Sequence, residues 1–238
     1  MNSLYEIDVI ALAIAFIPIV VVIGIFIFWS LDSKTTIYAS IRMLIQLVAI
    51  GYILTSIFAF NNPGLVVFVL VVMLLIASWI ALRPLQQRSA KQFFHALVAI
   101  AVGGVSTLLL TTFAVLKIQY WYQPQYVIPL AGMIFSNAMN TVSLAAERFE
   151  SEQKRSNDYA QSRNTAFTAS LIPIINTFLA VGLVALPGMM TGQILSGVSP
   201  LIAAKYQIVI MSIWLGSSGI SAAIFLYLQQ GNDAEKLT

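Results

Sequence analysis

The sequence contains no cysteine and few charged residues. Of its 238 residues, 9% are charged and 59% are hydrophobic. Without cysteine there is neither a disulfide framework nor a thiolate ligand for a metal ion. So little charge excludes an ordinary water-soluble domain, in which about a quarter of the residues are charged. No basic stripe interleaved with aromatic residues occurs, so we predict no nucleic-acid partner.

Residues that could supply energy for transport are also missing from the long apolar runs. No G-x-x-x-x-G-K-[S/T] motif is present, so the chain cannot hold ATP phosphates itself. Every carboxylate lies at an end or between apolar runs, and His95, the one histidine, lies near the start of a run, close to Lys91. We interpret His95 as an interfacial or packing residue rather than a proton relay. Uphill transport would therefore take its energy from another polypeptide.

The runs offer no metal triad, carboxylate pair or Ser-His arrangement, so we predict no catalytic residue, no metal-ligand cluster and no cofactor.

The apolar runs have the lengths of membrane spans. A hydrocarbon core of ~30 Å takes about 20 helical residues. Two runs are longer and are interrupted by turn residues, Asn61-Asn62-Pro63-Gly64 and Pro187-Gly188. We predict an all-α polytopic helical bundle of about seven spans, forming a single transmembrane domain over residues 1–238. The predicted spans are Val9–Leu31, the two halves of Met43–Leu82, Gln92–Leu116, about Tyr126–Ala146, the first part of Asn164–Ala204 and about Tyr206–Leu228.

The distribution of Lys and Arg predicts the orientation, because cytoplasmic loops hold the excess of basic residues. With the N-terminus outside, nine of the twelve Lys and Arg residues are cytoplasmic. These are Lys34, Arg83, Arg88, Lys91, Arg148, Lys154, Arg155, Arg163 and Lys236. Lys117 and Lys205 lie outside, and Arg42 lies within a helix. We therefore expect a cytoplasmic C-terminus and a multi-pass protein surrounded by lipid in the bacterial inner membrane.

Arg42 and Gln46 are the first candidates for a substrate pathway. They are four residues apart and share one helical face. A guanidinium buried in a span must find carbonyls, water or an anion. The alternative is that Arg42 reaches back to the nearby inner interface.

Further polar residues mark the fifth and sixth spans. Asn137 and Asn140 form a polar stripe, which either holds helices together or lines a path. Asn176 precedes the segment from Pro187 to Gln193. Pro187, Gly188 and Gly192 predict that this helix breaks or packs very closely, which makes the segment our candidate gate. Met189 and Met190 could contact a soft metal ion, although methionine more often fills gaps in a core.

The long predicted cytoplasmic loop, residues 147–163, carries eight charges of mixed sign. Its first part could extend the fifth helix, with Glu150 and Lys154 forming an i,i+4 pair. The loop is either a solvated connector or a docking element for a partner, in which case the contacts would be Arg148, Glu150, Lys154 and Arg155.

Three segments in order resemble a known family. They are Ser40–Phe58, Val127–Met139, and Val181–Gly192 followed by Lys205-Tyr206-Gln207. From about residue 36 to 228 the chain is similar to the FetB (YbbM) family, the membrane half of ABC transporters implicated in iron export and metal or oxidative stress resistance. Plant relatives act in aluminium tolerance. The resemblance implies a permease that pairs with a separate ATPase subunit, as a dimer of such pairs, with Gln207 in the pathway.

The chain departs from the family pattern at two places. Between Glu152 and Pro173 it is shorter and lacks the Leu-Gly-Ala stretch that resembles an ATPase-coupling helix. It also has Leu179 where the family tends to carry a lysine.

The sequence and the resemblance together predict a permease subunit that exports a metal ion such as iron and is driven by a separate ATPase. The alternatives are a non-transporting scaffold or regulator, and a permease for an anionic or nucleotide-sugar solute, since Arg42 would repel a cation. The predicted pathway residues are Arg42, Gln46, Asn137, Asn140, Asn176, Pro187, Gly188, Met189, Met190, Gln193 and Gln207.

Overall fold

The computed structural model describes residues 8–59, 62–86, 88–156 and 158–230. Every regular element in these ranges is a helix, as predicted for an all-α membrane protein. The chain forms two compact units, residues 1–60 and 61–238. The prediction of one transmembrane domain is not tested by this division.

The first unit consists of the helices α1 (Val9–Ile14), α2 (Ile17–Phe28) and α3 (Lys34–Ala59). The Asp8 carboxylate starts α1 by accepting a hydrogen bond of 2.7 Å from the Val9 amide. Asp32 starts α3 in the same way, accepting from the Lys34 amide at 3.1 Å. Neither α1 nor α2 has a buried residue, although both are almost wholly apolar. Such surfaces are stable in lipid and not in water.

The second unit begins where the sequence predicts a break. Asn62 caps α4 (Pro63–Ala81) by accepting from the amides of Gly64 and Leu65 at 2.9 and 3.4 Å. Pro63 occupies the first helical position, where its missing N–H costs nothing. The apolar run Met43–Leu82 is therefore two helices, as predicted.

The next span is one helix with two wide turns. It comprises α5 (Ala90–Ile100), the π-helical stretch η1 (Ala101–Val105), α6 (Ser106–Leu109) and a second π-helical stretch, η2 (Leu110–Val115). A capping box starts it, with Ser89 and Gln92 exchanging hydrogen bonds of 3.1 Å. Single π-turns inside α-helices are rare and are frequent at functional sites.

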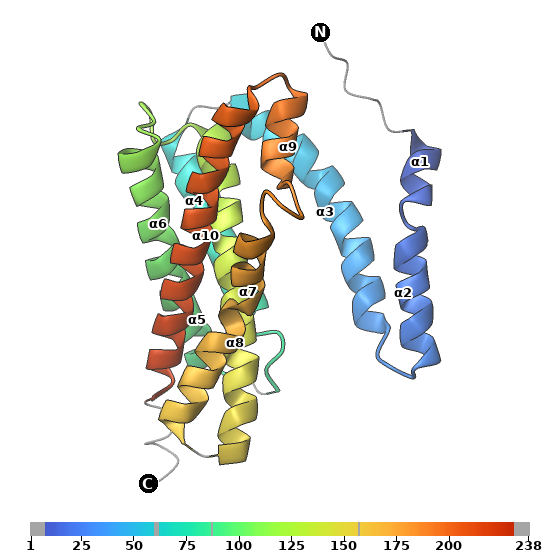
Figure 1. The fold of residues 1–238 in the computed structure, drawn as a ribbon, viewed down its shortest axis with the longest axis vertical. Coiled ribbons are helices and arrows are strands. Elements are labelled where there is room, and N and C mark those ends of the chain that lie inside the picture. Colours follow the sequence, from blue (N-terminus) through green and yellow to red (C-terminus); the bar gives the residue numbers. More distant parts are fainter. Residues whose placement is uncertain (1–7, 60–61, 87, 157, 231–238) are drawn as a thin grey trace. The chain divides into compact units, whose positions relative to one another are not determined.

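Two long helices form the centre of the second unit (Figure 1). These are α7 (Pro124–Ser156) and α10 (Pro200–Leu228). They pack against each other and against α8 (Tyr159–Ala180), while α4 also packs on α7, and α5 and η1 pack on α10. The buried core between them is built from small and branched side chains, such as Ala138, Val142 and Ala222, all 0% exposed. These small residues let the helix backbones approach closely, as is usual in membranes.

Six continuous helices among the described residues are long and apolar enough to cross a membrane. They are Val9–Phe28, Lys34–Phe58, Pro63–Ala81, Ala90–Val115, Pro124–Ser156 and Pro200–Leu228. The predicted sixth span is absent from this set because the chain there is divided between α8 and the eight-residue α9 (Gly188–Leu195). Figure 1 shows α8 rising from the α7–α8 turn to the middle of the second unit, and α9 continuing to the end where α10 begins.

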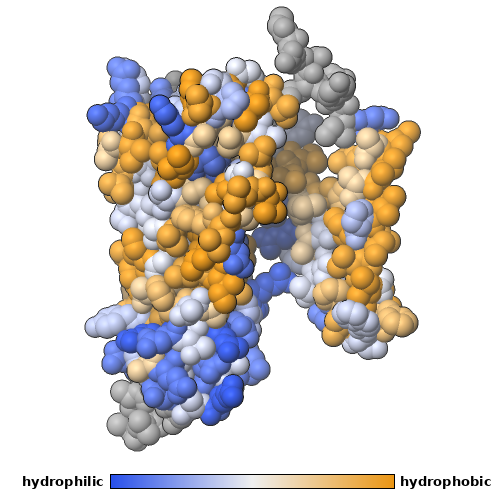
Figure 2. Space-filling model, viewed as in Figure 1, coloured by the Kyte–Doolittle hydropathy of each residue, from blue (hydrophilic) through white to orange (hydrophobic). Residues whose placement is uncertain are grey.

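Hydrophilic side chains of the second unit gather at the end where α7 meets α8, whereas hydrophobic side chains dominate the surface above it (Figure 2). α7 runs ten residues past the predicted end of the fifth span, at Ala146, and carries the charged segment with it. The prediction that the fifth helix extends into the 147–163 segment is therefore confirmed.

Gly103 allows the closest helix contact in the second unit to form. A Cβ atom added there would lie 2.9 Å from the Ser221 amide nitrogen and 3.0 Å from the Ser217 carbonyl oxygen, and closer still to the Ser221 hydroxyl. Real Cβ atoms do not approach backbone this closely, so η1 and α10 meet at Gly103 because it has no side chain.

Replacing Gly103 by alanine is expected to destabilise the protein by about 1–3 kcal/mol, because η1 and α10 must move apart. Thermal unfolding of the detergent-purified protein measures this as a lower Tm. The matched control is Gly216→Ala on α10, where nothing lies within 4 Å of an added Cβ. There we expect an equal or higher Tm, because alanine favours helix. A Gly103→Ala protein as stable as the wild type would contradict the packing.

Candidate functional site

The connection between α8 and α9 is the most irregular backbone in the second unit. α8 ends at Ala180, whose carbonyl oxygen accepts hydrogen bonds from three successive amides, those of Leu183, Val184 and Ala185, at 3.2, 2.8 and 3.2 Å. The chain thus folds back on itself in a tight turn instead of continuing the helix. The sequence predicted a break or close packing here, and the structure has a break.

Gly182 and Pro187 account for this break. Gly182 has φ +80°, a conformation that side chains disfavour, and its amide donates to the Ala185 carbonyl at 3.0 Å. Pro187 stands immediately before α9 and accepts hydrogen bonds from the Thr191 amide (2.9 Å) and hydroxyl (3.1 Å). Gly188 and Gly192 have nothing within 4 Å of an added Cβ, so they do not mediate close packing among the described residues.

The break carries exposed apolar side chains. Leu183 is 89% exposed and Val184 is 85% exposed in the structure. Irregular backbone in a membrane is stable only where protein or a water-filled cavity satisfies its polar groups. The backbone amides of Val181 to Ala185 meet this requirement through hydrogen bonds within the chain.

Two glutamines on the α9–α10 hairpin have buried amide atoms without partners. α9 packs against α10, and Gly197, with φ +90°, forms the turn between them. Gln207 on α10 is 4% exposed, and neither its amide nitrogen nor its amide oxygen has a hydrogen-bond partner among the described residues. The Gln193 oxygen on α9 is buried and lacks a partner in the same part of the chain. An unpartnered buried polar group costs about 1–3 kcal/mol, so these amides are arranged to meet something other than their own helices.

Part of the predicted polar stripe on α7 is hydrogen-bonded within its own helix. Asn137 is half-buried, and its amide nitrogen donates to the Met133 carbonyl at 2.8 Å, one turn back. The Ser136 hydroxyl donates to the same carbonyl at 3.1 Å. Asn140, one turn further along, is exposed. Among the α7 residues, Asn140 is thus the more available to a solute.

The remaining predicted pathway residues lie at separate places. Asn176 is exposed near the end of α8, Met189 is 37% exposed on α9, and Met190 is half-buried. Arg42 is half-buried and Gln46 exposed on α3 of the first unit, where they are described only within that unit. In the second unit, α9, which carries Gln193, packs against α10, which carries Gln207.

Sequence reasoning missed a set of buried polar groups further along α10. The Trp214 indole nitrogen and the hydroxyls of Ser218 and Ser221 are buried without hydrogen-bond partners among the described residues. Together with Gln207 they recur at helical spacing along this helix. The run Gly216-Ser217-Ser218-Gly219 inside an apolar span was the available signal.

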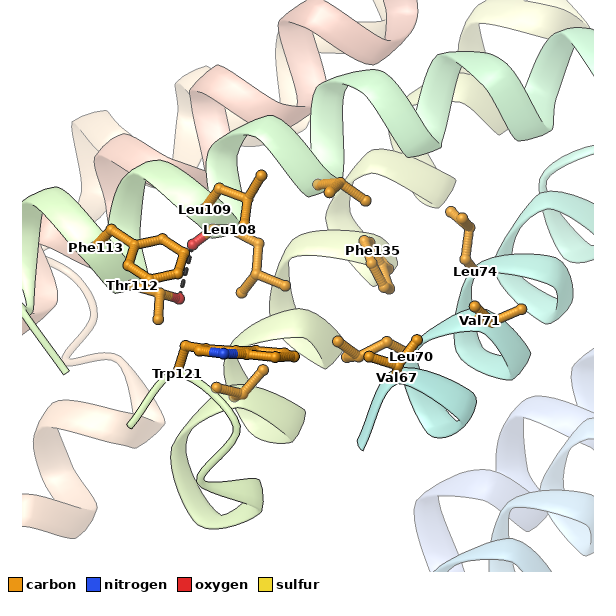
Figure 3. A pocket seen from close by; sticks show the side chains of 12 residues that line it. Val67, Leu70, Val71, Leu74, Leu108, Leu109, Thr112, Phe113, Trp121 and Phe135 are labelled. Carbon is orange, nitrogen blue, oxygen red and sulfur yellow. Dashed lines mark hydrogen bonds between the residues drawn. The ribbon is translucent and has the colours of Figure 1, made fainter. Parts of the chain in front are cut away.

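A separate pocket of about 210 Å³ lies between α4, the α6–η2 segment and α7. Its walls are apolar, as Figure 3 shows for Leu74, Leu109 and Phe135. None of the predicted pathway residues lines it.

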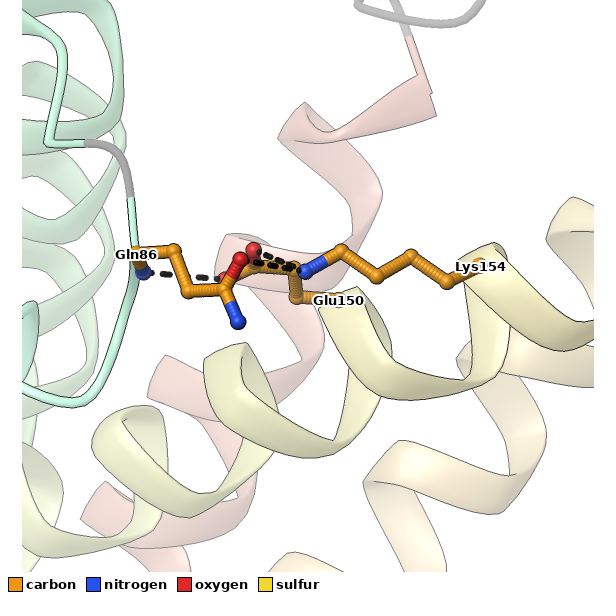
Figure 4. A network of polar contacts seen from close by, with 3 residues as sticks. All are labelled: Gln86, Glu150 and Lys154. Atoms are coloured by element: carbon orange, nitrogen blue, oxygen red, sulfur yellow. Dashed lines mark hydrogen bonds and ion pairs between the residues drawn. The ribbon is translucent and has the colours of Figure 1, made fainter.

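The charged end of α7 is held against the α4–α5 connection. Lys154 contacts Glu150 at 2.8 Å, the i,i+4 pair that the sequence predicted. Lys154 also donates to the Gln86 side-chain oxygen at 2.9 Å, while the backbone N–H of Gln86 donates to the Glu150 carboxylate at 3.4 Å (Figure 4). Arg148 pairs with Glu152 at 2.7 Å. We refer to Gln86, Glu150 and Lys154 as the clamp.

The α7–α8 turn is an ordered helical hairpin. Asp158 caps α8 by accepting from the amides of Ala160 and Gln161 at 2.8 and 3.2 Å. The Tyr159 hydroxyl donates to the Leu226 carbonyl at 3.0 Å and thereby ties the hairpin to the end of α10. Whether residues 147–163 are a solvated connector or a docking element for a partner stays a prediction.

No solved structure matches the chain. Several proteins of known sequence do. A UPF0014 membrane protein of Synechocystis sp. is 36% identical over 218 residues, 84% of each chain. Escherichia coli has a protein named "Probable iron export permease protein FetB", 34% identical over 214 residues, which cover 82% of this chain and 80% of FetB. "Protein ALUMINUM SENSITIVE 3" of Arabidopsis thaliana is 28% identical over 207 residues, or 81% of this chain and 74% of the plant protein.

These relatives confirm the resemblance inferred from the three sequence segments. The match to the uncharacterised protein family UPF0014 extends over residues 9–232, nearly the whole chain. The protein is thus a multi-pass membrane protein that belongs to the UPF0014 family.

Proposed function

We propose that this protein is the permease subunit of an ABC transporter in the plasma membrane, exporting a metal ion such as iron with energy from a separate ATPase subunit. The observation that carries the proposal is the broken α8–α9 segment together with Gln207 on α10, the helix that packs against α9. The side-chain amide of Gln207 is buried and has no hydrogen-bond partner among the described residues. Discontinuous helices of this kind form the substrate sites of many transporters. The name of the E. coli relative supports iron export as the activity to test.

The side chains of the second unit suit the passage of a cation better than its tight binding. Within the described ranges, no three His, Cys, Asp or Glu side chains come together to hold a metal ion. A cation would instead meet amide and carbonyl oxygens around Gln193, Gln207 and the break, with the Met190 thioether nearby. Neutral oxygens bind divalent ions weakly, and weak binding allows release.

We propose seven crossings, with α8, the break and α9 together forming the sixth, an outside N-terminus and a cytoplasmic C-terminus. The absence of native cysteine makes this directly testable with single cysteines. Ser199→Cys should react with a membrane-impermeant maleimide in intact cells, because it follows α9. Gln161→Cys, at the start of α8, should react only after permeabilisation. Equal labelling of both positions would contradict a crossing by α8 and α9.

Replacing Gln207 by leucine is expected to reduce ATP-dependent iron export from vesicles by about tenfold, because a hydrogen bond to the passing solute is lost. Stability should stay equal or rise, since the substitution removes a buried amide that has no partner in the described structure. Transport rate and Tm, measured on the same preparation, separate the two effects.

The control is Gln119→Leu in an exposed position of the segment before α7. It should leave export unchanged. Full export by Gln207→Leu would remove Gln207 from the pathway and favour a non-transporting scaffold or regulator. Export of an anionic solute in place of iron would favour the alternative substrate class.

We propose that the ATPase docks on the end of the second unit formed by the clamp and the α7–α8 turn, with Arg148, Glu150, Lys154 and Arg155 at or near the contact. This end is rich in charge and its helices are fixed to one another. A rigid surface can transmit force from a partner, whereas a loose loop cannot.

Reversing the charge of Arg155 tests this docking. Arg155→Glu should lower co-purification of the ATPase subunit and reduce coupled export, because it opposes the charge that the partner meets. Arg155 is exposed, so the free energy of unfolding, followed through the Tm, should change by less than about 1 kcal/mol. Lys205→Glu, the same change at the opposite end, should retain the ATPase. Equal retention by both variants would contradict docking at the α7–α8 end.

We also propose that two permease subunits associate through the face that carries the break. The support is the exposure of Leu183 and Val184, which lie in the break and are 89% and 85% exposed.

A further inference from the structure

The apolar pocket of the second unit has no part in the proposed transport path. It lies at the end of the bundle opposite the α7–α8 turn, between α4, the α6–η2 segment and the start of α7. Its volume of about 210 Å³ exceeds that of apolar cavities of ~150 Å³ that bind benzene. It is therefore large enough for a section of a hydrocarbon chain.

Its walls offer nothing to a polar ligand. The one hydroxyl among the lining residues, that of Thr112, donates to the Leu108 carbonyl at 2.8 Å. The Trp121 ring lies across one side of the pocket and closes it there (Figure 3). An occupant must be apolar.

The pocket opens toward the bilayer. Val71 on α4, Leu109 on α6 and Phe113 on η2 line it and are 48%, 50% and 55% exposed. These residues belong to helices long and apolar enough to cross the membrane, so their exposed sides face lipid tails. An acyl chain can enter sideways without crossing water.

The segment that closes the pocket carries the features of a headgroup site. The Tyr122 ring contacts the rings of Tyr120 and Trp121, with centroids 5.9 Å apart in both pairs. Amphipathic rings of this kind lie at the level of lipid headgroups. Lys117, exposed, stands between the lining residues Phe113 and Trp121 in the chain.

The backbone around Lys117 is fixed. Lys117 has φ +49°, and the amides on its two sides donate to Thr111 and Thr112 carbonyls at 2.8 and 3.1 Å. No carboxylate occurs in the sequence between Asp32 and Glu147, so this whole stretch provides no acidic residue to neutralise Lys117. A phosphate group would supply the missing charge.

We propose that the pocket binds one acyl chain of an anionic phospholipid, whose phosphate contacts Lys117. The observations that carry this are the wholly apolar pocket with exposed lining residues, and the lysine and aromatic residues in the chain segment that contributes Phe113 and Trp121 to its walls. The inference is independent of what the protein transports.

Lipid retention tests the proposal. The full-length protein is reconstituted in nanodiscs containing equal amounts of phosphatidylglycerol and phosphatidylcholine, extracted in mild detergent and weighed by native mass spectrometry. The wild type should retain phosphatidylglycerol in preference to phosphatidylcholine. Val71→Phe and Leu109→Phe, which fill the pocket from two walls, should lose the retained lipid.

Matched controls separate the pocket from general lipid contact. Ile76→Phe adds a ring to a 47% exposed position on α4 outside the pocket and should retain lipid like the wild type. Lys117→Gln should lower the preference for phosphatidylglycerol by about twofold to fivefold, whereas Lys205→Gln should not.

Two results would overturn the proposal. One is equal lipid retention by the pocket-filling variants and Ile76→Phe, which would mean that the bound lipid lies elsewhere. The other is retention of phosphatidylcholine by the wild type as strongly as phosphatidylglycerol, which would leave Lys117 without a role. A Tm for each variant verifies that it is folded, and the two pocket-filling variants act from different helices.

Discussion

Lipid cannot accept or donate a backbone hydrogen bond, and this constraint determines where the structure can be irregular. Outside the tight turns that join the helices, the described chain keeps its amides paired within helices. The two π-helical stretches rearrange that pairing without abandoning it, and the Ser and Thr hydroxyls of the same span donate back to carbonyls one turn away, as Thr107 does to Gly103. The segment from Val181 to Pro187 leaves helical geometry, although the backbone amides of Val181 to Ala185 keep hydrogen bonds within the chain. A helix break, and glutamine side chains on α9 and α10 whose amide atoms have no partner among the described residues, are components of a solute site.

The helix α10 combines two roles that usually conflict. On one side it packs tightly, through Ser217 and Ser221 against Gly103. Along its length it also buries polar atoms that have no hydrogen-bond partner in the part of the chain that the structure describes, at Gln207, Trp214, Ser218 and Ser221. Burying such groups lowers stability. Small residues recover part of this lost stability, because they allow α7, α8 and η1 to approach α10 closely. The close packing of α10 thus compensates in part for the polar atoms that it buries.

Much of the fold could be predicted because membrane spans follow from composition and length. The break at Asn62-Pro63 and the interruption at Pro187 were both predicted, since proline and glycine act locally. The Glu150–Lys154 pair was predicted for the same reason. The contact of Gln86 with Lys154 was not, because it joins residues 68 positions apart. The burial of Gln207 and the π-turns at Gly103 depend on which helices meet, and no local pattern specifies that. The pathway role of all eleven predicted residues, including Gln193 and Gln207, stays a prediction.

The helix α7 has a consequence for how force could travel through the molecule. Its 33 residues form a rod of about 50 Å, with the clamp near one end and Asn137 and Asn140 near its middle. Pro129, the internal proline of α7, lies on the far side of Asn137 from the clamp, so the helix between the clamp and Asn137 contains no proline. A continuous helix resists compression, so a displacement of its charged end can be transmitted to the interior. Since α7 also packs along α8 and α10, tilting it by a small angle would shear both neighbours at once. α7 thereby connects the surface on which a partner would act to α8, the helix that ends at the break.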